Sequence, residues 1–258
     1  MAFFPLPIMR LCFSLLAALA LLASDAQAQT SRLFLVPTAR PVQRVEVGAR
    51  WIVPSVEANL GRGVSVGMSG LALPVDDDLN ALGLADVRWT FANRERWALA
   101  VGVNAAAEYS SGHDSGHVPF SMHPYVVGTV GGASSSASAG VGVSVTGRDE
   151  YRFPDSGCPQ CGFLSVSPEY RVGVRSLPYL FGGVEAEMGR VEASAYSFVA
   201  EALAAPTGDN HYNTLAMGGM RVTHKRVTVD LGGAFSTEVW DGQRQTDAAP
   251  WVALSVGF

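Results

Sequence analysis

One stretch of the chain decides the fold: Trp97-Ala98-Leu99-Ala100-Val101-Gly102-Val103-Asn104-Ala105-Ala106-Ala107-Glu108-Tyr109. Its odd-numbered positions are apolar, and its even-numbered positions are small, polar or charged. Thirteen residues in strict period two predict a strand about 43 Å long at ~3.3 Å per residue. Ordinary strands have about five or six residues, so the predicted strand is unusually long.

The same two-sided pattern returns along the chain, around residues 86–91, 140–146, 164–175 and 227–235. A soluble sheet hides its apolar face against another layer, whereas a membrane barrel turns that face toward lipid and lines its lumen with the polar face. Crossing hydrocarbon takes roughly 9 to 11 residues per strand, and several segments here are that long. The pattern therefore favours a transmembrane barrel.

The expected fold class is all-β, a single closed antiparallel transmembrane β-barrel of about 12 strands, with ten also possible. The strands are expected near residues 45–53, 62–73, 84–92, 96–109, 118–130, 137–147, 163–174, 178–188, 191–203, 214–223, 226–236 and 250–258. An even count puts both ends on the periplasmic side. One inconsistency remains, because the long loop at 148–162 then falls among the short periplasmic turns. Ser176-Leu177-Pro178 and Gly189-Arg190 could each be a turn or a bulge.

Residues 1–28 are expected to be a cleaved signal peptide, which leaves a barrel domain at 29–258. Arg10 supplies the positive charge, residues 11–23 are apolar, and Ala26-Gln27-Ala28 has the form of a cleavage site. The apolar run is shorter than the ~20 residues of a membrane-spanning helix.

Composition excludes other classes. Only 16% of the 258 residues are charged and the net charge is −5 without a basic run, so nucleic acid is not an expected partner. Removal of Cys12 with the signal leaves Cys158 and Cys161, which excludes a framework of several disulfides. Their spacing suits a redox dithiol or half a zinc site, but a local disulfide is favoured and the redox state stays open.

The last nine residues, Pro250-Trp251-Val252-Ala253-Leu254-Ser255-Val256-Gly257-Phe258, form an alternating segment with a terminal aromatic residue. This resembles the C-terminal strand of bacterial outer-membrane β-barrel proteins. The resemblance implies an outer-membrane location, contact with its lipid, and insertion by the barrel assembly machinery through Phe258. Residues 35–41, 61–70 and 213–235 also resemble uncharacterised outer-membrane barrels of Bacteroidetes-like bacteria. No catalytic residue comes with either resemblance.

Charged residues on the polar face are the most informative candidate site. They are Glu46, Arg50, Asp86, Arg88, Glu108, Glu169, Arg171, Arg175 and Asp230. Such groups either pair across a narrow lumen, because an unpaired charge there carries a desolvation penalty, or select the solutes of a pore.

Other motifs carry weaker alternatives. Gly63-Val64-Ser65-Val66-Gly67 spells a nucleophile elbow, but it lies inside a predicted strand and not at a strand-to-helix turn. His113, His117 and His123 with Asp114, and the acidic run Asp76-Asp77-Asp78, lack a defined ligand spacing, and solvated loops are favoured. No metal, cofactor or catalytic residue is therefore expected.

Three functions follow in order of preference. The first is a non-enzymatic outer-membrane barrel, either a narrow channel or a structural envelope component. The others are an outer-membrane lipid hydrolase and a soluble exported β-sandwich that binds a ligand. Interfacial aromatic girdles are expected at Trp51, Trp89, Trp97, Tyr109, Trp251 and Phe258. The oligomeric state and an open lumen are left undecided.

Overall fold

A computed structural model describes residues 37–41, 45–50, 53–75, 78–110, 120–132, 134–152, 169–208, 211–240 and 243–258. The predicted signal peptide lies outside these residues. The strands are β1 (Val45–Arg50), β2 (Val53–Gly61), β3 (Val64–Val75), β4 (Asp78–Asn93), β5 (Trp97–Ser110), β6 (Phe120–Gly131), β7 (Ser135–Arg152), β8 (Glu169–Val191), β9 (Ser194–Gly208), β10 (His211–His224), β11 (Val227–Trp240) and β12 (Gln243–Gly257). No helix within the described ranges is long and apolar enough to cross a membrane.

The strands form one closed sheet. Each pairs antiparallel with its neighbours in the sequence, and β1 pairs with β12 to complete the circle. At the seam Arg50 lies opposite Ala253, and the backbone N–H of Phe258 donates to the carbonyl of Val45 at 2.7 Å. The predicted fold class is therefore confirmed, with twelve strands. The alternative of a soluble sandwich is wrong, because the described strands make a single closed sheet and not two packed sheets.

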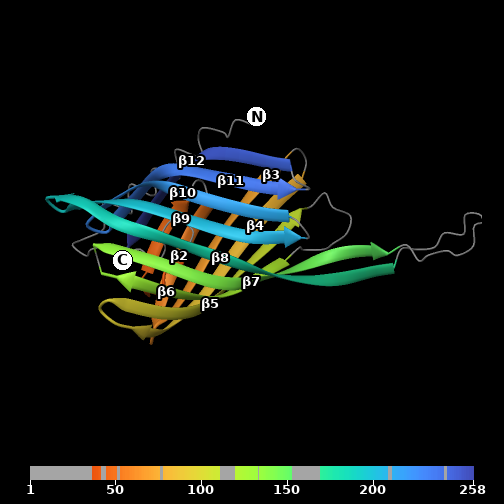
Figure 1. Cartoon of the computed structure of the whole chain (residues 1–258), viewed down its shortest axis with the longest axis horizontal. Coiled ribbons are helices and arrows are strands. Elements are labelled where there is room, and N and C mark those ends of the chain that lie inside the picture. Colours follow the sequence, from red (N-terminus) through yellow and green to blue (C-terminus); the bar gives the residue numbers. More distant parts are fainter. Residues whose placement is uncertain are drawn as a thin grey trace, which may run out of the picture.

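The two ends of the barrel differ. At the end that holds the C-terminus, neighbouring strands are joined by short turns, in which Arg62, Glu192 and Lys225 adopt positive φ angles of 52°, 53° and 53°. Tight hairpins need that left-handed conformation. Long connections at 111–119 and 153–168 belong to the opposite end and lie outside the described residues. There β7 and β8 project well beyond the other strands (Figure 1).

Two strand predictions are wrong, one by an extra strand and one by a missing strand, so the total of twelve is unchanged. The expected strands at 163–174 and 178–188 are one strand, β8, of 23 residues. Conversely, the expected strand at 45–53 ends at Arg50, and β2 follows as a strand not anticipated from the sequence. Together the added strand β2 and the merged strand β8 move the long loop near 148–162 to the end away from the termini, which removes the inconsistency.

The merger has a local cause. Pro178 lies within β8 opposite Val143 and interrupts neither the strand nor its pairing with β7. Near Gly189 the register with β9 shifts between Glu187 and Gly189, so this glycine marks a β-bulge and not a turn.

Candidate functional site: the barrel lumen

The barrel wall is apolar outside and polar inside. On β4, Val87, Trp89 and Phe91 are 46%, 51% and 47% exposed, and the alternating Asp86 and Arg88 are buried. Large exposed apolar side chains recur on the outer face of other strands, among them Met68, Leu99, Val126, Val141, Leu180, Phe198, Leu231 and Val252. A soluble protein rarely exposes a continuous apolar surface of this extent.

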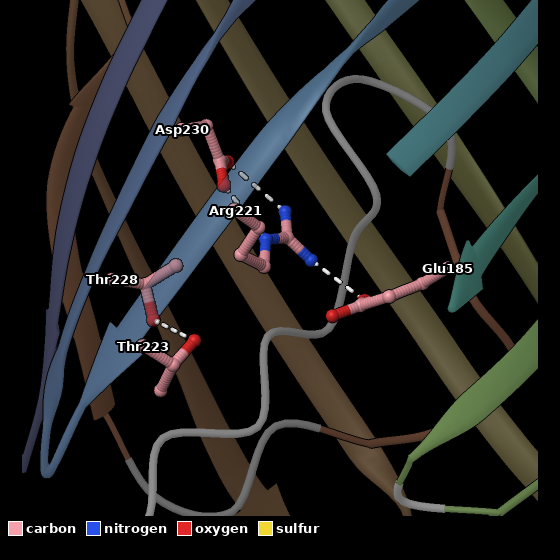
Figure 2. A network of polar contacts seen from close by, with 5 residues as sticks. All are labelled: Glu185, Arg221, Thr223, Thr228 and Asp230. Carbon is pink, nitrogen blue, oxygen red and sulfur yellow. Dashed lines mark hydrogen bonds and ion pairs between the residues drawn. The ribbon is translucent and has the colours of Figure 1, made fainter. Parts of the chain in front are cut away.

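Buried ion pairs cross the inner face of the wall. Arg221 on β10 binds both carboxylate oxygens of Asp230 on β11, at 2.7 and 3.0 Å, and it reaches Glu185 on β8 at 2.8 Å (Figure 2). Arg88 on β4 pairs with Glu57 on β2 at 2.8 Å. Because each arginine is almost fully buried, these pairs supply the charge compensation that a desolvated guanidinium needs.

The structure places the predicted inward charges as follows. Asp86, Arg88 and Asp230 are buried within the lumen, and Glu46 and Arg50 are half-buried against a cavity. The side chains of Glu108, Glu169, Arg171 and Arg175 lie outside the described residues. Glu57, Glu185, Glu201 and Arg221, which sequence reasoning missed, are further lumen-facing charges. Pairing register could have identified them, since Glu57 lies opposite Glu46 and Arg221 lies opposite Asp230.

A cavity of about 210 Å³ lies against β1 to β6. Three carboxylates line it, those of Glu46, Glu57 and Asp86, together with the guanidinium of Arg50. Ser55, Ser69, Asn104 and His123 supply its other polar side chains, so His123 lies on the inner face of β6 and not in a solvated loop. The cavity is large enough for small hydrated solutes, and carboxylates are the most numerous charged groups in its lining.

Aromatic side chains fill another part of the lumen. Tyr125, Tyr179 and Phe181 are buried, with the Tyr179 and Phe181 rings stacked at 5.8 Å and Phe181 meeting Tyr125 edge to face. The Tyr125 hydroxyl donates to Asp86 at 3.1 Å. These rings join Val127, Val199, Met217 and Trp251 in one apolar cluster inside the barrel.

Glycines make room for these rings. The ring of Tyr125 lies against Gly102, and that of Tyr179 lies against Gly142, so closely that a Cβ at either position would collide with it. The missing side chains let the aromatic residues lie flat on the wall, as in aromatic rescue of glycine in designed sheets.

One predicted girdle residue is misplaced. Trp251 is 9% exposed and belongs to the inner cluster with Ala253, whereas Val252 between them is 49% exposed. Period two requires this, because neighbours along a strand face opposite sides. Val256 shares the parity of Val252 but is buried, so the outer face of β12 is not exposed along its whole length. Trp89 and Trp97 do face outward, and Trp51 and the side chain of Tyr109 lie outside the described residues.

A short N-terminal segment also lies inside the barrel. Thr38 and Ala39 are buried, and the backbone of Ala39 is hydrogen bonded to the lumen-facing hydroxyls of Thr90 and Thr129. Nothing in the sequence pattern indicated this, because residues 37–41 lack alternation.

The remaining motifs gain no support. Ser65 is the second residue of β3 and is fully buried, whereas a nucleophile elbow requires an exposed serine at a strand-to-helix turn. Among the described residues no group of three or more His, Cys, Asp or Glu could hold a metal ion. His113, Asp114, His117, Asp76, Asp77, Cys158, Cys161 and the side chain of Asp78 lie outside the described residues.

Comparisons with known proteins add little. No family matches the chain, and no curated protein matches it either. Among solved structures the chain is similar to a NanC porin, at 10% sequence identity and a TM-score of 0.42, over 83% of this chain and 98% of that one. The narrower grouping with Bacteroidetes-like barrels gains no support from these comparisons.

Proposed function

We propose that this protein is a non-enzymatic outer-membrane β-barrel that acts as a narrow channel. The observation that carries the proposal is the inverted wall: apolar side chains are exposed outside a closed sheet whose inside holds buried ion pairs. Closure satisfies the backbone groups of the strands, which is what hydrocarbon demands of a spanning structure.

The difference between the two ends of the barrel indicates its orientation in the membrane. Barrels of this kind have short periplasmic turns and longer extracellular loops. The C-terminus and the short turns therefore face the periplasm, and the projecting β7–β8 hairpin faces outward. Trp89 and Trp97, exposed near the periplasmic turn between β4 and β5, fit an interfacial girdle. The signal peptide at 1–28 and insertion through Phe258 remain predictions that fit this location.

Twelve strands enclose a lumen between the filled eight-stranded barrel and the open porin of sixteen or more. Here that lumen is narrowed by the aromatic cluster and ion pairs, yet it keeps the acidic cavity beside β1 to β6. This combination favours a small pore with restricted conductance.

The test is conductance of the purified, folded protein in planar bilayers. Folding is established first by heat-modifiable migration on gels. Steady single-channel openings, smaller than those of a sixteen-stranded porin, are expected. A folded protein that inserts but stays silent contradicts the channel and leaves a structural envelope barrel. A protein found in the soluble periplasm contradicts both.

A further inference from the structure

The segment at residues 37–41 occupies the lumen as a short peptide that bends at Ala39 and Arg40. Thr38 is 6% exposed and Ala39 is fully buried, although both precede β1 and belong to none of the strands that build the wall. Ala39 packs in the same apolar cluster as Tyr125 and Phe181. A piece of chain outside the wall therefore lies among the side chains that line it.

Side chains of the wall hold the backbone of this segment. The N–H of Ala39 donates to Thr129 Oγ1 on β6 at 2.7 Å, and the hydroxyl of Thr90 on β4 donates to the carbonyl of Ala39 at 2.9 Å. Thr129 is itself hydrogen bonded to Ser138 on β7 at 2.9 Å. Both backbone groups of Ala39 are thus bound by hydroxyls from two strands of the wall.

The segment runs inward from the periplasmic rim. The guanidinium of Arg40 donates to the carbonyls of Glu95 and Gly131, both at the turns of that end. Pro37, at the other end of the segment, borders a second cavity of about 90 Å³ with Tyr179, Phe181 and Leu215. The segment thus reaches from the rim near β4 and β6 toward the wall formed by β8 to β10.

We propose that residues 37–41 are an internal plug, and that the lumen carries a binding surface for a short peptide backbone, which the chain's own segment occupies. This inference rests on the proposed channel. Few hydrogen bonds hold the segment and each stabilises it only modestly, so the tethered segment can leave without unfolding the barrel. Its attachment to β1 keeps its effective concentration high and makes occupancy the resting state.

The first experiment compares the full mature chain with a variant lacking residues 29–41. Both are checked for folding by heat-modifiable migration and then measured in planar bilayers. The variant is expected to show a larger single-channel conductance. A synthetic peptide of residues 29–41, added from the periplasmic side, is expected to reduce that conductance again.

Two point variants test the plug even if the variant lacking residues 29–41 does not fold. Thr129→Val removes the acceptor for Ala39 but keeps the size and shape of the side chain. Thr228→Val is the matched control, because Thr228 is an equally buried lumen threonine that hydrogen bonds Thr223, not the segment. Only Thr129→Val is expected to raise the open probability of the full chain.

The outcomes separate the two proposals. Equal conductance of the full chain and the folded deletion variant, or equal effects of the two threonine variants, overturns the plug and leaves the channel intact. Silence of both the full chain and the folded deletion variant overturns the channel and the plug together.

Discussion

Arg221 and Asp230 lie directly opposite each other on β10 and β11, and two guanidinium nitrogens of Arg221 bind the two carboxylate oxygens of Asp230. This fork-to-fork arrangement is the strongest geometry available to such a pair. The remaining arm of Arg221 reaches Glu185 on β8, so one side chain connects strands that are not neighbours in the sheet. The ion pair therefore braces the inner face of the wall across the intervening strand β9.

Arg221→Met is expected to destabilise the barrel by roughly 3 to 5 kcal/mol, because it leaves the buried carboxylate of Asp230 without its counter-charge. Urea unfolding of the protein in lipid vesicles measures the loss. Arg190→Met is the control: its pair with Glu187 is half exposed at the rim, and such pairs contribute at most about 1 kcal/mol. Equal unfolding midpoints for the two variants would contradict the bracing role.

Val101→Arg is expected to cost roughly 2 to 4 kcal/mol at the bilayer midplane, because it places a charge on the lipid side of β5. Its neighbour Gly102 lies against the inward ring of Tyr125, which fixes Val101 on the outside. Asn104→Arg is the comparison, since Asn104 lines the acidic cavity. Reversible folding into vesicles compares the variants, and equal stability would show that the facing assignment is wrong.

Gly102→Val is expected to cost roughly 1 to 3 kcal/mol through overpacking, since the new side chain must displace Tyr125 and its hydrogen bond to Asp86. Tyrosine fluorescence and thermal unfolding report the displacement. Gly83→Ala should be tolerated, because a Cβ there meets its nearest neighbour only at 4.0 Å. Equal unfolding temperatures for Gly102→Val and Gly83→Ala would contradict the close packing of Tyr125 against Gly102.

The channel is expected to prefer cations, because the carboxylates of Glu46, Glu57 and Asp86 outnumber the guanidinium groups of Arg50 and Arg88 at its larger cavity. Asp86→Asn removes one carboxylate and should shift the reversal potential in a potassium chloride gradient toward zero. Ser69→Ala, a neutral change in the lining of the same cavity, should leave the reversal potential in place. An unchanged reversal potential in Asp86→Asn would show that this cavity does not set the ion selectivity.

The alternation of apolar and polar residues predicted the closed barrel, because it shows which face of each strand meets lipid and which faces the lumen. The prediction failed where apolar residues follow one another and the alternation is lost. Trp51-Ile52-Val53-Pro54 is a continuous apolar run, so the boundary between β1 and β2 carries no polar signal. Pro178 and Gly189 had the composition of turns, but both are accommodated within strand pairing.

The contents of the lumen were harder to predict than its charge. Period two places Tyr179 and Phe181 on one face but does not say that neighbouring glycines accept their rings, because that depends on cross-strand register. The plug is a tertiary contact between residues about 90 positions apart, as between Ala39 and Thr129, and carries no local pattern.

The seam between the first and last strands sets the order of assembly. β1 has only six residues, and its second partner, β12, arrives more than two hundred positions later in the chain. Until β12 pairs with β1, the incomplete sheet has two unpaired edge strands, and such edges promote aggregation. The barrel therefore cannot close until β12 is available, and until then both edges of the incomplete sheet stay unpaired.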